Sequence, residues 1–310
     1  MKKYLAKHKE LVVFFLFIAL IGGNFIFEAK DNDRNNFSTK KIEYKKLKIG
    51  LINDIHARSD SNVNGGRELK GYMQEELTYF AEKMKSEFNV NVIVNNGDVI
   101  EGTNISSDKG MMELTEVKKI LDKIGSPIYW VLGNHDLRSV DKNQWKESLG
   151  IDYTNKSFKI NGYKIIILDS NFDIDNSDIL PGKYFTRGKI SIAQYKWLKG
   201  ELASVEKKII FVHHPPLTKT GIKKEGQLLV NAKKFQDLFS QGNVVAVFAG
   251  HTEELYNTKI DGVEYFIFPG PEKKRKHPGA FTEIIVDGFD LRVIFYEKNK
   301  TGEYVSKKIK

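Results

Sequence analysis

From residue 47 onward the chain alternates short apolar runs with segments of helical periodicity, and this alternation constrains the fold more than any other feature. The apolar runs 47–53, 90–95 and 128–132 have the length and composition of buried strands. Between them, apolar residues recur at helical spacing up to Phe88 and again over 112–124. Strand, helix and strand in units of about 40 residues predict parallel strands joined by right-handed crossovers.

The second half of the chain adds hairpins to the same pattern. Strands over 157–160 and 163–168 flank Asn161-Gly162, a strong signal for a two-residue hairpin turn. The further predicted elements are a helix capped by Ser191 that runs to Leu202, a strand over 208–212, a helix around 232–239, a strand over 244–249, and hairpins over 256–268 and 280–296. We find no internal repeat and no second boundary. The region 47–310 is therefore predicted to form one domain, with two sheets face to face and helices outside.

Polar residues with ligand chemistry follow five of the predicted strands. The carboxyl ends of parallel strands lie along one edge of a sheet, which is where open α/β sheets bind ligands. Each ending alone has an ordinary explanation as a turn, a helix cap or a satisfied loop histidine. One shared site explains all five more simply than five separate structural roles. The endings are Asp54-Ile55-His56, Gly97-Asp98, Gly133-Asn134-His135-Asp136, His213-His214 and Gly250-His251-Thr252-Glu253.

The chain has no cysteine, so any metal must be held by histidine, carboxylate or amide groups. Such ligands suit Mn, Fe or Zn. Two divalent ions bridged by one carboxylate can clamp a phosphoryl group during in-line displacement. The expected ligands are Asp54 and His56 for the first ion, Asn134, His213 and His251 for the second, and Asp98 between them. The predicted reaction is hydrolysis of a phosphoester.

His135 and Asp136 stand next to these ligands in the sequence, and we assign them a catalytic role. His135 need not bind metal, because beside the site it can donate a hydrogen bond or a proton to the departing oxygen of the substrate. We expect the carboxylate of Asp136 to orient the His135 ring.

Taken in order, these motifs resemble those of the calcineurin-like metallophosphoesterase family. The resemblance extends over about residues 47–270 and rests on Asp54-x-His56, Gly97-Asp98-x-x-Glu101, Gly133-Asn134-His135-Asp136, His213-His214-Pro215-Pro216 and Gly250-His251-x-Glu253. It implies a four-layer αββα sandwich of two mixed β-sheets flanked by helices, a dinuclear metal centre, and a bridging water or hydroxide as nucleophile. Leu168-Asp169-Ser170 and the segment 194–202 also resemble the cyclic-nucleotide-phosphodiesterase-like branch, although such stretches can equally serve packing.

The last motif departs from the family pattern, which implies Gly-His-x-His with its second histidine on the first metal. Glu253 stands at that position here. A carboxylate can ligate and would favour Mn or Fe over Zn, or it can turn away and leave Glu254 or a water in its place. We hypothesise that Glu253 is a metal ligand. In the pair His213-His214 the family pattern favours the first histidine as the ligand, which places His214, like His135, nearer the substrate.

The N-terminus is predicted to be a targeting segment. Residues 1–10 carry four lysines, and the uncharged apolar stretch 11–27 is just long enough to span a bilayer. The lysines indicate a cytoplasmic N-terminus, and a polar linker over 28–46 would connect the anchor to a catalytic domain outside the cytoplasm. The alternative is a signal peptide cleaved near Ala29, which would give a secreted protein.

The net charge of +9 permits attraction to anionic substrates, but a solvated lysine-rich surface explains it equally. The same two readings apply to the basic loop 272–277, which can lie at the mouth of the site. We infer a phosphoester substrate, with a diester favoured over a monoester, and a membrane partner for the N-terminal segment. We infer no specific nucleic-acid or protein partner. The alternative function is a non-catalytic binding protein that retains the fold, which the preserved motifs disfavour.

Overall fold

A computed structural model describes residues 42–60, 66–218 and 225–310 of the chain. The predicted anchor over 11–27 and most of the polar linker lie outside the described residues. Among the helices that are described, none has the length and apolar character needed to cross a membrane. The structural statements below concern the unit Ile42–Lys310.

The first sheet has six strands in the order β12-β11-β10-β1-β2-β3. They are β1 (Leu47–Ile52), β2 (Val92–Asn95), β3 (Ile128–Trp130), β10 (Phe281–Asp287), β11 (Asp290–Lys298) and β12 (Tyr304–Lys308). The first three strands run parallel, as the crossover pattern predicts, whereas β10 pairs antiparallel with β1. Strand β1 is therefore flanked on both sides, which suits its apolar sequence.

The second sheet has the order β4-β5-β6-β7-β9-β8. Its strands are β4 (Lys156–Ile160), β5 (Tyr163–Leu168), β6 (Lys208–Val212), β7 (Val244–Ala249), β8 (Tyr256–Ile260) and β9 (Val263–Ile267). The four inner strands run parallel and the two edge strands are antiparallel to their neighbours. The hairpin predicted at Asn161-Gly162 is confirmed, because the two residues have φ angles of 50° and 87°, as a type I′ turn requires.

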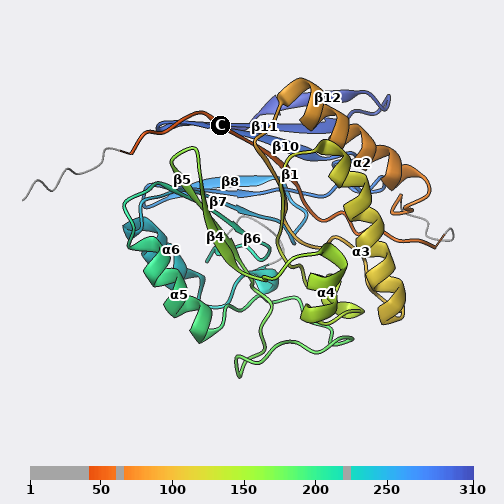
Figure 1. The fold of residues 1–310 in the computed structure, drawn as a ribbon, viewed down its shortest axis with the longest axis horizontal. Helices are drawn as coiled ribbons and strands as arrows, with labels where there is room; N and C mark the ends of the chain where they lie inside the picture. The colour runs from red at the N-terminus through yellow and green to blue at the C-terminus, as the bar shows by residue number, and fades with distance from the viewer. Residues whose placement is uncertain (1–41, 61–65, 219–224) are drawn as a thin grey trace, which may run out of the picture. The chain divides into compact units, whose positions relative to one another are not determined.

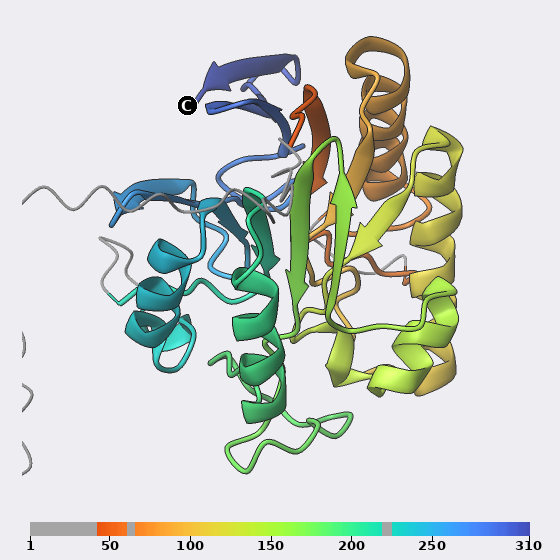
Figure 2. The same cartoon turned by 60° about the vertical axis from the view of Figure 1, so that its left-hand side comes forward.

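The two sheets pack face to face, and helices cover their outer faces (Figures 1 and 2). Apolar side chains from both sheets, such as Leu51 and Phe248, share one buried cluster between them. Helices α2 (Tyr72–Glu82), α3 (Ser107–Leu121) and α4 (Lys142–Leu149) pack on the first sheet, and α5 (Ile192–Leu202) and α6 (Ala232–Gln241) pack on the second. The predicted arrangement of two mixed sheets flanked by helices is confirmed.

The sequence patterns do not predict α4 or β12. Helix α4 has only eight residues, and a capping box rather than apolar periodicity defines its start. Asp141 accepts a hydrogen bond from Gln144 N, and the Gln144 side chain accepts one from Asp141 N. Helix α3 starts at Ser107 instead of the predicted Met112, because the Ser106 side chain caps it. Shorter helical segments span Lys83–Phe88, Asp122–Ile124, Asp136–Arg138 and Glu225–Gln227.

Two buried asparagines connect the carboxyl ends of strands in the two sheets. Asn53 follows β1 and donates to Ala249 O of β7 over 3.0 Å, although the two residues are 196 positions apart. Asn96 follows β2 and donates to Phe248 O over 3.4 Å. These bonds hold the ends of β1, β2 and β7 together, so the residues that follow the three strands meet in one place.

Candidate metal centre

The residues that follow the strands turn sharply towards one another. Asp54, His56, Asp98, His251 and Glu253 all have positive φ angles, between 45° and 66°. Residues other than glycine rarely adopt this left-handed backbone conformation, because it costs about 1–3 kcal/mol of strain per residue. Residues with such strain cluster at functional sites. Backbone hydrogen bonds enforce it, since His56 N donates to Asp98 O over 2.9 Å.

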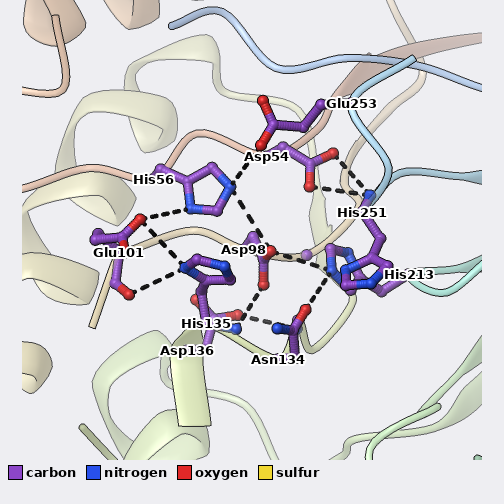
Figure 3. Close-up of polar contacts among 12 residues, drawn as sticks. Asp54, His56, Asp98, Glu101, Asn134, His135, Asp136, His213, His251 and Glu253 are labelled. Carbon is purple, nitrogen blue, oxygen red and sulfur yellow. Dashed lines mark hydrogen bonds and ion pairs between the residues drawn. The ribbon is translucent and has the colours of Figure 1, made fainter. Parts of the chain in front are cut away.

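The carboxylate of Asp98 lies at the centre of the cluster (Figure 3). Its Oδ2 is 3.2 Å from His213 Nε2 and 3.7 Å from His56 Nε2, and its Oδ1 accepts a hydrogen bond from His135 N over 2.8 Å. Two groups have ligand atoms within 4.8 Å of one another, namely His56, Asp98 and His135, and Asp98, His213 and His251. Because both groups contain Asp98, this residue has the position expected of a bridging ligand.

Asn134 and His251 belong to the second half of the site, and two consecutive main-chain carbonyls hold them. Asn134 Nδ2 donates to Phe185 O over 3.1 Å. His251 Nε2 lies 2.7 Å from Thr186 O. The loop that precedes α5 therefore fixes the orientation of both side chains, in the way that outer contacts orient metal ligands.

His213 completes the second half. Its Nδ1 lies 3.0 Å from Asn96 O, and its Nε2 lies 3.2 Å from Asn134 Oδ1. The remaining ring nitrogen of His251, Nδ1, is buried and has no hydrogen-bond partner among the described residues. A buried nitrogen in this state has a lone pair available for a cation. The donor set of this half therefore fits a metal ion.

The first half contains Asp54, His56 and Glu253. Both carboxylate oxygens of Asp54 accept from His251 N, at 3.0 and 3.1 Å. His56 Nδ1 lies 3.2 Å from Glu101 Oε2, and His56 Nε2 lies 3.6 Å from Glu253 Oε1. Asp54 and Glu253 belong to this half, but neither is a member of the two groups whose ligand atoms lie within 4.8 Å of one another. The predicted residues are brought together here, with His135 as an additional neighbour.

His135 is oriented by Glu101 and not by Asp136, which corrects the sequence prediction. His135 Nδ1 lies 3.2 Å from Glu101 Oε2 and 3.3 Å from Glu101 O. The carboxylate of Asp136 instead accepts from Ile100 N and Gly133 N, at 3.1 and 3.0 Å, so it shapes the loop. Because the His135 side chain is 18% exposed while Asp136 is fully buried, His135 faces the open side of the site.

His213 contacts the shared carboxylate of Asp98, whereas His214 lies beside His251. His214 packs against His251 with ring centroids 4.3 Å apart, and its Nδ1 lies 2.8 Å from Ser170 Oγ. Its side chain is fully buried. The contact of His214 with substrate stays a prediction.

The two segments that resemble the cyclic-nucleotide branch contact each other. The Gln194 side chain accepts from Asp169 N over 2.9 Å and donates to Asp169 O over 2.7 Å. Asn171 Nδ2 donates to Leu132 O over 2.7 Å. These bonds fix the end of β5 beside the loop that carries Asn134. Their role in the fold is support of the site.

The pKa values of the cluster follow from burial combined with nearby charges. Burial raises the pKa of Asp98, but His213 outweighs it and holds that pKa well below its usual range. Burial lowers the pKa of His56, yet the Glu101 and Asp98 carboxylates raise it to about 9. Burial and the charge of His213 lower the pKa of His251 to about 3, so its ring is neutral at pH 7.

The basic loop between β9 and β10 lies against the site. Gly270 at its start passes so close that an added Cβ would lie 1.9 Å from Asp54 O. Arg275 reaches the cluster, with its Nε 2.9 Å from Glu253 Oε2, while Lys273 and Lys276 are exposed. Arg275 of this loop therefore contacts a residue of the candidate site, and the position of the loop at the mouth of the site stays a prediction.

Two further residues of the site have no role in the sequence analysis. Glu101 contacts both His56 and His135, and its place three residues after Asp98 in a motif was an available signal. Arg67 Nη1 lies 2.6 Å from Glu101 Oε2. Arg67 follows a polar loop and stands in no motif, so nothing in the sequence marks it.

The chain belongs to the calcineurin-like phosphoesterase family, whose sequence profile matches residues 47–254. A probable cyclic nucleotide phosphodiesterase from Rhodococcus erythropolis is 29% identical over 153 residues, covering 47% of this chain and 46% of the relative. A cAMP/cGMP dual specificity phosphodiesterase from Mycobacterium tuberculosis is 25% identical over 215 residues, covering 67% and 64%. The chain thus matches about half to two-thirds of the length of these relatives.

Among solved structures, the fold is similar to that of a dimetal phosphatase from Danio rerio. The TM-score is 0.66 at 18% sequence identity, and the match covers 84% of this chain and 98% of the other. This likeness agrees with the fold that the motif resemblance implies. The family assignment from the five motifs is confirmed.

Proposed function

We propose that the protein is a metal-dependent phosphoesterase with two divalent ions. The observation that carries this proposal is the pair of compact ligand groups that share Asp98, at the carboxyl ends of strands from both sheets. Family membership supports the same chemistry. The proposed ligands are Asp54, His56 and Glu253 for the first ion, Asn134, His213 and His251 for the second, and Asp98 for both.

The chemistry of the bound ions would be charge stabilisation of the phosphoryl group and activation of a water molecule. The protein residues supply orientation around it. Glu101 holds His135 Nδ1, so the rest of the imidazole is free to hydrogen-bond or protonate the departing oxygen. Substrate would enter on the side of His135 and Arg275, whose side chains are 18% and 40% exposed, because Asp98 and His213 are buried.

We propose a phosphodiester in preference to a monoester as the substrate. The names of the two curated relatives support this choice, as do the segments around Asp169 and Gln194. We propose Mn or Fe in preference to Zn, because the carboxylate of Glu253 is a harder ligand than the histidine of the family pattern.

The experiment is an assay of the metal-stripped protein with bis-p-nitrophenyl phosphate and p-nitrophenyl phosphate while Mn, Fe, Zn and Mg are added back. We expect metal-dependent hydrolysis with a higher rate for the diester. Asp98→Ala should abolish it, and Asp122→Ala, which removes an exposed carboxylate on a helix end, should not. A folded protein with no turnover under any metal would favour the non-catalytic binding protein.

We also propose, from the sequence alone, that residues 11–27 anchor the protein in a membrane with its catalytic domain outside the cytoplasm. The support is the apolar stretch behind four lysines. Retention of the full chain in membranes washed with alkaline carbonate is the expected result. Release of a shortened chain into the medium would favour cleavage and secretion.

A further inference from the structure

Glu253 stands where the family pattern has histidine, and a second side chain accompanies it. Its Oε1 lies 3.6 Å from His56 Nε2, and its Oε2 lies 2.9 Å from Arg275 Nε. Arg275 belongs to the basic loop, about 20 residues further along the chain. The carboxylate therefore lies between a proposed ligand and an arginine from another loop.

Arg275 is also part of a closed ring in which basic and acidic side chains alternate. Its Nε lies 2.9 Å from Glu272 Oε2, and Arg67 Nη2 lies 2.9 Å from the same oxygen. Arg67 Nη1 contacts Glu101 Oε2 at 2.6 Å, and that oxygen lies 3.2 Å from His56 Nδ1. The ring thus begins and ends at the two nitrogens of His56. Its members in order are His56, Glu101, Arg67, Glu272, Arg275 and Glu253.

The ring answers an electrostatic problem at Glu253. Its side chain is 10% exposed, and the charge of the buried Asp54 carboxylate repels it. A neutral histidine at this position would meet no such repulsion. Arg275 places a positive charge 2.9 Å from Glu253 Oε2, on the side of the carboxylate away from His56. Its Nε donates its hydrogen bond to Glu272 Oε2, so Arg275 acts on Glu253 through its charge.

We propose that Arg275 is a positioning residue for the first metal, acting through Glu253, so that the two side chains together replace a histidine ligand. This inference rests on the proposed function, because it concerns the same dinuclear site. An isolated ion pair at an exposed arginine contributes little. Here the acidic partners are only 8% and 10% exposed, and residues that orient metal ligands typically change metal affinity about 10- to 100-fold.

The test is a titration of the metal-stripped protein with Mn²⁺, followed by electron paramagnetic resonance and calorimetry. The parent should bind two ions. Arg275→Gln should weaken one of the two sites about 10- to 100-fold and leave the other unchanged. Lys276→Gln is the matched control, because it removes the same charge from the same loop at an exposed residue, and it should bind like the parent.

A double-mutant cycle separates positioning from a general structural role. In the Glu253→His background the side chain at position 253 is neutral and does not depend on the charge of Arg275. Adding Arg275→Gln to that background should therefore change Mn²⁺ affinity less than twofold. An equal loss in both backgrounds would overturn the inference. The inference would also be overturned if Arg275→Gln bound Mn²⁺ at both sites with the affinity of the parent. A parent that binds fewer than two ions would instead overturn the proposed function and this inference with it.

Discussion

The two halves of the metal site are held in different ways. Around the second half, the carbonyl oxygens of Phe185, Thr186 and Asn96 contact the ligand side chains. Around the first half, the contacts of His56 and Glu253 are with charged side chains from three loops. Carbonyl dipoles stay fixed as long as the loop is folded, whereas an ion-pair ring depends on each of its charges. The ligand geometry of the second half should therefore be rigid, whereas the metal affinity of the first half should change when a charge of the ring is altered.

The largest expected effect comes from the residue that both halves share. Asp98→Asn keeps the shape and removes the bridging charge, so both Mn²⁺ sites should weaken together. The rate should fall at least about 10²–10³-fold, the range for loss of one preorganised electrostatic contact. Calorimetry with Mn²⁺ and steady-state kinetics check this. Loss of one site only would show that Asp98 belongs to a single half.

The next effect isolates the second half. His251→Ala removes a neutral ring held by Thr186 O and should eliminate one Mn²⁺ site, with a rate loss of about 10²-fold. Excess metal should not restore it, because carbonyls cannot replace the lost nitrogen. His277→Ala, a histidine paired with Glu297 outside the cluster, serves as the control. Full recovery of the rate of His251→Ala at high Mn²⁺ would contradict the proposed difference between the two halves.

A smaller effect, on stability, should follow from neutralising Glu272, which lies between the two arginines of the ring. Burial raises the pKa of Glu272, but Arg67 and Arg275 outweigh it and lower that pKa below its usual value. Its ionised form thus stabilises the fold above the unfolded-state pKa, and this contribution is lost as the pH falls through the folded-state pKa. Glu272→Gln should reduce the free energy of unfolding by about 1 kcal/mol at pH 7.

Urea unfolding of parent and variant at several pH values measures that difference. It should shrink as the pH falls below about 4.5. Glu116→Gln, which loses only a surface ion pair with Lys119, should differ little from the parent at any pH. A difference for Glu272→Gln that grows on acidification would contradict the assigned direction of the pKa shift.

The smallest effect is that of salt. Raising the ionic strength from about 0.1 to about 1 M shortens the Debye length from about 10 to about 3 Å. Because the ring is only partly buried, the Mn²⁺ dissociation constant of the first half should rise about twofold more than that of the second. The difference should disappear in Arg275→Gln. Equal salt dependence of both halves in the parent would show that the ring does not tune the first one.

The sequence predicts the sheets and most of the metal cluster because both depend on local patterns. Apolar runs define the strands, and the polar residues directly after them fall at one edge of the fold. Asn134 follows β3 of the first sheet and His213 follows β6 of the second, and packing of the two sheets brings Asn134 Oδ1 within 3.2 Å of His213 Nε2. Helix α4 escapes prediction because its short polar sequence depends on a cap and on the burial of Trp145.

The surroundings of the ligands are not predictable in the same way. Arg67 and Arg275 are charged residues on loops 208 positions apart, and each resembles a solvated surface residue in the sequence. Only the closed fold brings both to Glu272. Asp136 was expected at His135 because the two are neighbours in sequence. The tight loop instead turns its carboxylate to the backbone of Ile100 and Gly133.

The position of β1 has a consequence for how the protein is made. This strand leads into Asp54 and His56, yet one of its two neighbours is β10, with Leu47 opposite Val286. Contacts between such distant parts of a chain slow folding and leave unpaired strand edges exposed meanwhile. Until β10 has been synthesised, the strand that leads into Asp54 and His56 therefore lacks one of its two neighbours. We expect a nascent chain without β10 to hold these two residues less firmly than the complete fold does.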